Sequence, residues 1–136
     1  MSMYSKRFVY YQPNEKDLKD EYGDCTIRAL SKALDISWLE AFDLMIPFCR
    51  EEQIPNIFYG TLEVRKRVMD QLGFSYTGIS NRKGSRRPTV DSFAKDHQTG
   101  TFILNVANHE VAVVDGHFYD TWDSGDCSVY GYFERR

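Results

Sequence analysis

The dipeptide Asp115-Gly116 constrains the fold of this chain more than any other feature. It separates two runs rich in β-branched and aromatic residues, His109 to Val114 and His117 to Thr121. Asp-Gly between such runs favours a two-residue β-hairpin turn, because both turn positions require a positive φ. The sequence therefore predicts two antiparallel strands in which Val114 pairs with His117.

This register brings a histidine and an aspartate to one face of the hairpin. Asp120 lies opposite Val111, which is two residues from His109 and shares its face. Diagonal neighbours on paired strands are roughly 7–8 Å apart, so an imidazole and a carboxylate can meet across that gap. The prediction depends on the turn, because a shift of one residue would place the two side chains on opposite faces. Asp123 is the alternative partner for His109 in a different register.

A second informative stretch runs from Glu21 to Leu34 and begins a helix. Its apolar residues have the spacing of one helix face, and Cys25 lies at the N-terminal tip of that face. A thiol there feels the positive end of the helix dipole, which favours the thiolate. A small buried cysteine that only packs is the alternative, because free cysteine is among the most buried residue types. Arg28, one turn further, is expected to form an ion pair or to contact a substrate.

The remaining elements follow from capping signals and apolar spacing. Helices are expected over residues 37–49, begun by a Ser37–Glu40 capping box, over 61–72, followed by Gly73, and over 89–97. Further strands are expected over 8–12, 74–77, 101–106 and 129–133. Helical segments come first and strands after them. The sequence thus predicts a single α+β domain over residues 1–136, with N-terminal helices packed on a C-terminal antiparallel sheet.

Composition restricts the setting and the partners. The net charge of −3 disfavours general nucleic-acid binding, although residues 82–87 form a basic cluster. No run of about 18 apolar residues is present, so we expect no membrane contact, and the N-terminus lacks the apolar core of a signal peptide, so we expect a cytoplasmic protein. Cys25, Cys49 and Cys127 form no CxxC pair and the histidines lack ligand spacing. We therefore expect neither a metal site nor a cofactor.

Cys25, His109 and Asp120 together supply the roles needed for nucleophilic acyl transfer. A thiolate attacks the acyl carbon, an imidazole takes a proton and returns it to the leaving group, and a carboxylate orients the imidazole. Backbone N–H groups at the start of the helix would stabilise an oxyanion. The sequence leaves open whether the helix tip reaches the sheet.

Two blocks of the sequence carry a resemblance to known enzymes. They are residues 23–30, GDCTIRAL, and residues 109–123, HEVAVVDGHFYDTWD. Together they resemble the papain-like cysteine peptidase superfamily and are similar to its compact bacterial and phage members, including the C39-like peptidases. The first block is also similar to the nucleophile motif of OTU-type deubiquitinases, but Tyr22 replaces their aspartate three residues before the cysteine.

The resemblance implies a papain-like cysteine peptidase or amidase that acts on a peptide or protein substrate through a thioester. It makes Cys25 the nucleophile, His109 the general base and acid, and Asp120 the orienting residue, with no cofactor. Papain-like enzymes place an oxyanion-hole glutamine about six residues before the cysteine, where this chain has Lys19. Gln12 is the upstream substitute, at a different spacing.

Three alternatives accompany this interpretation. The same triad could serve hydrolysis, transamidation or deamidation, and hydrolysis is the default because water is the commonest acceptor. The missing glutamine favours a catalytically inactive papain-like fold that acts as a protein-binding module. A nucleic-acid-associated module that uses residues 82–87 is the third alternative, and the negative net charge disfavours it.

Overall fold

The predicted hairpin is present and forms part of the sheet. In the computed structural model, which describes residues 5–81 and 86–136, strand β4 (His109–Val114) turns through Asp115 and Gly116 into β5 (His117–Asp120). The two turn residues have φ angles of 48° and 81°, as a two-residue turn of this hand requires. Val114 pairs with His117, so the predicted register is confirmed.

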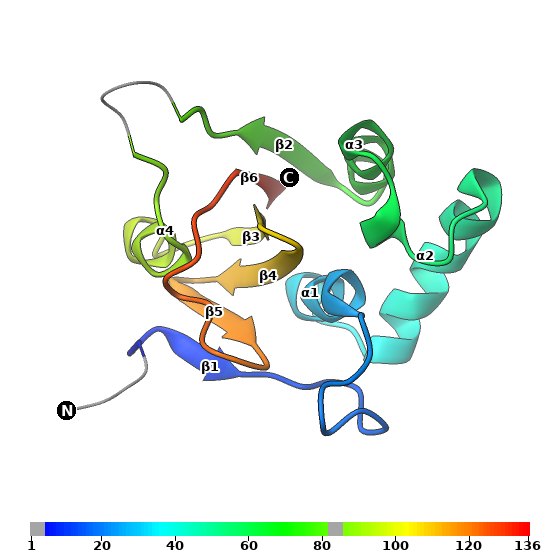
Figure 1. Cartoon of the computed structure of the whole chain (residues 1–136), viewed down its shortest axis with the longest axis horizontal. Coiled ribbons are helices and arrows are strands. Elements are labelled where there is room, and N and C mark those ends of the chain that lie inside the picture. The colour runs from blue at the N-terminus through cyan, green and yellow to red at the C-terminus, as the bar shows by residue number, and fades with distance from the viewer. Residues whose placement is uncertain (1–4, 82–85) are drawn as a thin grey trace.

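Within the described residues, four α-helices pack on a six-stranded mixed sheet, and the predicted α+β class is confirmed (Figure 1). The strand order is β1-β5-β4-β3-β6-β2. The other strands are β1 (Phe8–Tyr10), β2 (Phe74–Gly78), β3 (Thr101–Val106) and β6 (Gly131–Arg135). The helices are α1 (Cys25–Leu34), α2 (Trp38–Glu52), α3 (Leu62–Gln71) and α4 (Val90–Asp96), and a 3₁₀ turn, η1, spans Ile57–Tyr59.

One edge of the sheet differs from the expected antiparallel arrangement. Strand β1 pairs in parallel with β5, and its last residue, Tyr10, lies opposite Asp120. The backbone N–H of Tyr11 then donates to the carbonyl of Asp120 at 2.8 Å. The first strand ends at Tyr10 and is shorter than the predicted strand over residues 8–12. It covers the edge of β5 that β4 leaves free. This pairing ties the N-terminal segment to the end of the hairpin.

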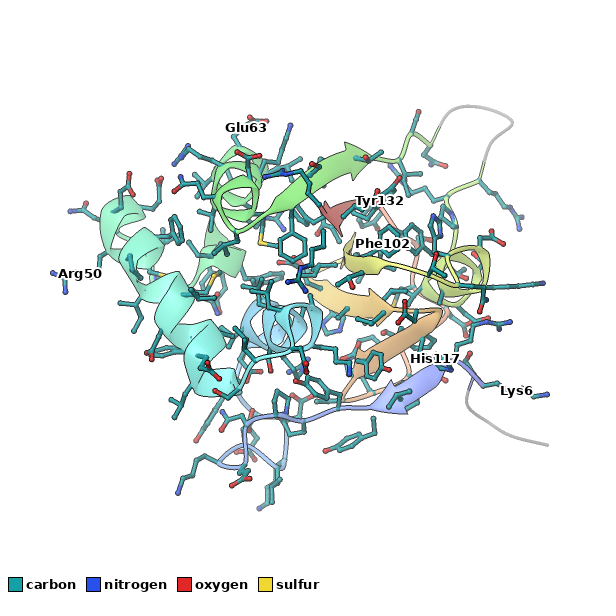
Figure 2. All side chains as sticks on the ribbon, turned by 180° about the vertical axis from the view of Figure 1, so that it is seen from behind. Lys6, Arg50, Glu63, Phe102, His117 and Tyr132 are labelled. Atoms are coloured by element: carbon teal, nitrogen blue, oxygen red, sulfur yellow. The ribbon has the colours of Figure 1, made fainter. Side chains whose placement is uncertain are left out.

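The sheet separates two hydrophobic cores (Figures 1 and 2). Helices α1 and α3 pack on one face, α2 packs on α1 on the same side, and Leu30 of α1 shares this core with Ala112 and Ile103. Helix α4 covers the other face, where the ring of Phe93 contacts Phe102 at a centroid distance of 5.2 Å. The predicted packing of N-terminal helices on the sheet is confirmed for α1 and α3. Helix α4 lies on the opposite face of the sheet, where Val90, Phe93 and Ala94 belong to the second core.

Local signals fix the helix boundaries. Ser37 and Glu40 form the predicted capping box at the start of α2, and the helix continues through Pro47 to Glu52. The side chain of Thr61 caps α3, and Gly73 follows that helix with a φ of 96°. No helix in the described ranges is long and apolar enough to cross a membrane. Residues 82–85 of the basic cluster lie outside the described residues.

Candidate active site

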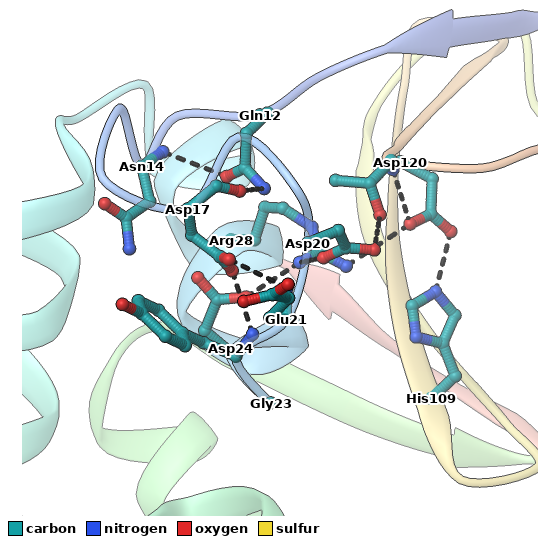
Figure 3. Close-up of polar contacts among 12 residues, drawn as sticks. Gln12, Asn14, Asp17, Asp20, Glu21, Gly23, Asp24, Arg28, His109 and Asp120 are labelled. Carbon is teal, nitrogen blue, oxygen red and sulfur yellow. Dashed lines mark hydrogen bonds and ion pairs between the residues drawn. The ribbon is translucent and has the colours of Figure 1, made fainter.

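The side chains of His109 and Asp120 meet at the end of the hairpin. Nε2 of His109 lies 2.7 Å from Oδ2 of Asp120, and both residues are buried (Figure 3). The sequence predicted this pair from the register alone. Asp123, the alternative partner, instead accepts the backbone N–H groups of Ser5 and Gly125.

Further donors fix the Asp120 carboxylate. The hydroxyl of Ser124 donates to Oδ2 at 2.6 Å, and the backbone N–H of Thr121 donates to Oδ1 at 2.8 Å. Nη2 of Arg28 approaches Oδ1 at 3.4 Å. A carboxylate with this many partners is held in one orientation, so it can orient the imidazole of His109.

Arg28 is the buried cation of the site, and the ion pair that was one of its two expected roles is present. It forms an ion pair with Asp24 at 2.8 Å, with Asp20 at 3.3 Å and with Asp120 at 3.4 Å (Figure 3). Asp24 also accepts from the indole N–H of Trp38. Because its positive charge faces three carboxylates, Arg28 connects helix α1 to the loop before it and to strand β5.

Cys25 begins helix α1 beside the histidine. Both residues line one cavity of about 180 Å³, where helix α1 packs against strand β4. The cavity is also lined by Asp20, Tyr22, Gly23, Asp24, Arg28, Phe58, Tyr59, Asn108 and Trp122. The structure thus places Cys25 and His109 on one cavity, and Asp120 contacts His109.

Glu110, a residue that was not among the predicted site residues, joins the cysteine helix to strand β4. Its carboxylate accepts the hydroxyl proton of Thr26 at 2.7 Å, and its backbone N–H donates to the sulfur of Cys25. Arg65 of α3 lies 3.8 Å from the same carboxylate. Burial raises the pKa of Glu110 above its ordinary value, while Thr26 and Arg65 oppose that shift. An acidic residue inside the run HEVAVV was the signal that could have revealed a buried polar partner.

The electrostatics of Cys25 differ from the expectation. Burial, and to a lesser extent the nearby charge of Glu110, raise the pKa of the thiol to about 12, although Arg28 opposes the shift. The prediction that the helix terminus favours a resting thiolate is therefore wrong, because the loss of hydration raises the pKa more than the neighbouring hydrogen bonds and the Arg28 charge lower it. At neutral pH the resting site holds a thiol.

Gln12 does not line this cavity. Its side-chain amide donates to the carbonyl of Asp17, and its side-chain oxygen accepts the backbone N–H of Asn14. These contacts place it within the loop that precedes α1 (Figure 3). Its role in an oxyanion hole stays a prediction. The first turn of α1 offers another source of N–H groups, because the Asp24 side chain does not cap that helix.

Trp122 covers the histidine from the solvent side. The two ring centroids are 5.1 Å apart, and the indole remains half-exposed. The backbone ladder stops before it, since the last paired residues are Ala112 and Tyr119. The contact limits the access of water to the His109–Asp120 pair.

Three carboxylates near the site, those of Asp17, Asp20 and Asp24, have oxygens within 4.8 Å of one another. Each of the three carboxylates already accepts hydrogen bonds from protein donors. Asp17 accepts the backbone N–H groups of Glu21 and Tyr22, and Asp20 accepts the hydroxyl of Thr121. Arg28 neutralises part of the charge. The group is therefore explained as a structural ion cluster.

Comparisons with protein families, with curated proteins and with solved structures found no match to this chain.

Proposed function

We propose that this protein is a papain-like cysteine peptidase or amidase that acts through a Cys25 thioester. The observation that carries the proposal is the 2.7 Å contact between His109 and Asp120, because His109 also lines the same cavity as Cys25. Nucleophile, base and orienting carboxylate are the three parts that acyl transfer needs. The substrate is a peptide or another amide.

The thiol of Cys25 transfers its proton to His109 as the sulfur attacks the carbonyl carbon. Because Nε2 of His109 contacts Asp120, the proton goes to Nδ1, and Asp120 stabilises the imidazolium that forms. This concerted transfer fits a thiol that is protonated at rest. The imidazolium then protonates the leaving amine, and the C–N bond breaks to give the thioester.

The oxyanion of the tetrahedral intermediate needs donors beside the sulfur. The backbone N–H groups in the first turn of α1 are the candidates, because they lie at the positive end of the helix. Water activated by His109 then attacks the thioester and releases the acid and the thiol. An amine in place of water would give transamidation, and attack on a side-chain amide would give deamidation.

The test combines turnover with trapping of the intermediate. We would incubate the protein with a fluorescence-quenched peptide library and measure cleavage, and detect the acyl adduct on Cys25 by peptide mass spectrometry. Cys25→Ala and His109→Ala should abolish both signals, whereas Cys127→Ala should leave both unchanged. Cleavage that persists in Cys25→Ala would refute the proposal.

The competing proposal is a catalytically inactive papain-like fold that binds a protein. It is favoured by an apolar cavity of about 250 Å³ beside α2, lined in part by Ile27, Phe42 and Ile46. Leu39, on the same helix, is 65% exposed. Unpaired apolar surface of this kind often marks an interaction site. If Phe42→Ser abolishes cellular activity while Cys25→Ala keeps it, the binding module is correct and the enzyme proposal fails.

A further inference from the structure

We propose that the cavity beside Cys25 receives a cationic group, such as a lysine or arginine side chain, next to the bond to be cleaved. The inference rests on the proposed function for its placement next to a scissile bond. The cavity combines aromatic rings with an excess of carboxylate charge, and both features attract cations.

The first observation is the aromatic lining. Tyr22, Phe58, Tyr59 and Trp122 all line the cavity with Cys25. Three of them are exposed enough to meet a ligand, with exposed fractions of 57% for Tyr22, 65% for Tyr59 and 46% for Trp122. They come from three segments: the loop before α1, the η1 turn and the loop after β5. A cation placed over such rings is attracted by their negative faces.

The second observation is the balance of charge. Asp20 and Asp24 line the cavity, Asp17 lies within 4.8 Å of them, and Asp120 lies behind His109. Arg28 is the one permanently cationic residue in the lining, and it is already paired with Asp20, Asp24 and Asp120. The four carboxylates therefore outnumber the one guanidinium, so the cluster carries an excess of negative charge.

The third observation is the position of Asp20 at the surface. About a third of its side chain is exposed, whereas the Asp24 and Asp120 side chains are nearly inaccessible. Asp20 can therefore present its charge to an incoming group while it keeps its contacts with Arg28 and Thr121. This geometry makes Asp20 the specificity-determining residue and opposes the entry of acidic groups.

The test compares small thiol reagents that differ only in charge. We would measure modification rates at Cys25 with 2-aminoethyl, 2-hydroxyethyl and 2-sulfonatoethyl methanethiosulfonate, by peptide mass spectrometry. In each case the cysteine sulfur forms an S–S bond to the reagent and methanesulfinate leaves. Because all three meet the same thiol, the ratio of two rates cancels the thiolate fraction.

We expect the amine-to-sulfonate rate ratio at Cys25 to exceed that of N-acetylcysteinamide by about fivefold or more at low salt. The neutral reagent should fall between the two charged ones. Adding 1 M salt should reduce the preference, because exposed charges are screened. Asp20→Asn should lower the ratio severalfold, whereas the matched control Asp43→Asn, on the exposed side of α2, should not.

A second pair of variants tests the aromatic contribution without changing the net charge. Tyr59→Leu should lower the ratio, and Tyr59→Phe should retain it, because only the ring face attracts the cation. A ratio at Cys25 equal to that of N-acetylcysteinamide would overturn the proposal. So would a ratio that is unchanged in both Asp20→Asn and Tyr59→Leu.

These rates need no turnover, so the two proposals can fail separately. A cation preference together with peptide cleavage that survives in Cys25→Ala would keep the cation site and refute the enzyme. Cleavage that depends on Cys25 without any cation preference would support the enzyme and refute the cation site. If both hold, a fluorogenic peptide with lysine beside the scissile bond should be cleaved faster than its glutamate counterpart.

Discussion

The imidazole of His109 and the carboxylate of Asp120 are in contact at 2.7 Å beyond the last backbone pair of their two strands. Their backbones pair instead with strands β3 and β1, and donors at the end of the hairpin complete the alignment of the two side chains. Ser124 and Thr121 hold the carboxylate, and Trp122 covers the ring. This arrangement makes the pair sensitive to single substitutions that leave the sheet intact.

Replacing Asp120 with asparagine should lower Cys25-dependent turnover. The neutral amide cannot stabilise the imidazolium, and losses of about 10²–10⁴-fold in kcat are typical for such a change. The matched control is Asp123→Asn, because Asp123 contacts backbone N–H groups and not His109. Equal losses in both variants would show that Asp120 does not orient the histidine.

The thiol of Cys25 should make the protein less stable at alkaline pH. Its pKa rises from 9.0 to about 12 on folding, so the folded state keeps a proton that the unfolded chain loses. Stability from this group is complete below pH 9 and declines as the pH rises towards 12. We expect Tm to fall more steeply between pH 9 and 11 in the native protein than in Cys25→Ala. Identical slopes would contradict a raised pKa.

Glu110→Gln should increase the alkylation rate of Cys25 by iodoacetamide at pH 8 severalfold. The substitution removes a negative charge that raises the thiol pKa and keeps an oxygen that can accept from Thr26. Glu110→Ala removes that oxygen as well and should cost about 1–3 kcal/mol of stability. The measurement is the alkylation rate of Cys25 divided by that of Cys49 in the same sample, compared between Glu110→Gln and the native protein. A lower ratio in Glu110→Gln would count against the proposed charge effect.

Arg28→Met should destabilise the fold by about 3–5 kcal/mol, because it leaves buried carboxylates without their cation. Asp24 and Asp120 are the buried partners concerned. Arg50→Met, at an exposed position of α2, is the control and should change the free energy of unfolding by less than about 0.5 kcal/mol. Urea unfolding of both variants measures the difference. A small loss in Arg28→Met would mean that the carboxylates are hydrated.

The sequence predicted those parts of the structure that depend on local chemistry. Asp115-Gly116 determined the hairpin register, and that register placed His109 and Asp120 on one face. Capping residues located the starts of α2 and α3. In each case the responsible residues are neighbours in the chain, so a short window of sequence contains the physical cause.

The remaining features depend on contacts between distant segments. The parallel pairing of β1 with β5 requires a free strand edge, which no local pattern reveals. The raised pKa of Cys25 follows from its burial beside Glu110, whereas the helix terminus alone suggested the opposite direction. The partners of Arg28 likewise come from distant parts of the chain: Asp20 lies in the loop before α1, and Asp120 lies at the end of β5.

The contacts that assemble the site span most of the chain. Thr26 and Glu110 are 84 positions apart, Arg28 and Asp120 are 92 apart, and Asp20 and Thr121 are 101 apart. Contacts of such high order require the closure of long loops, so their entropic cost is met only when the whole sheet condenses. Selective chemistry at Cys25 would therefore emerge late during refolding, and its appearance would time the final cooperative step of the folding reaction.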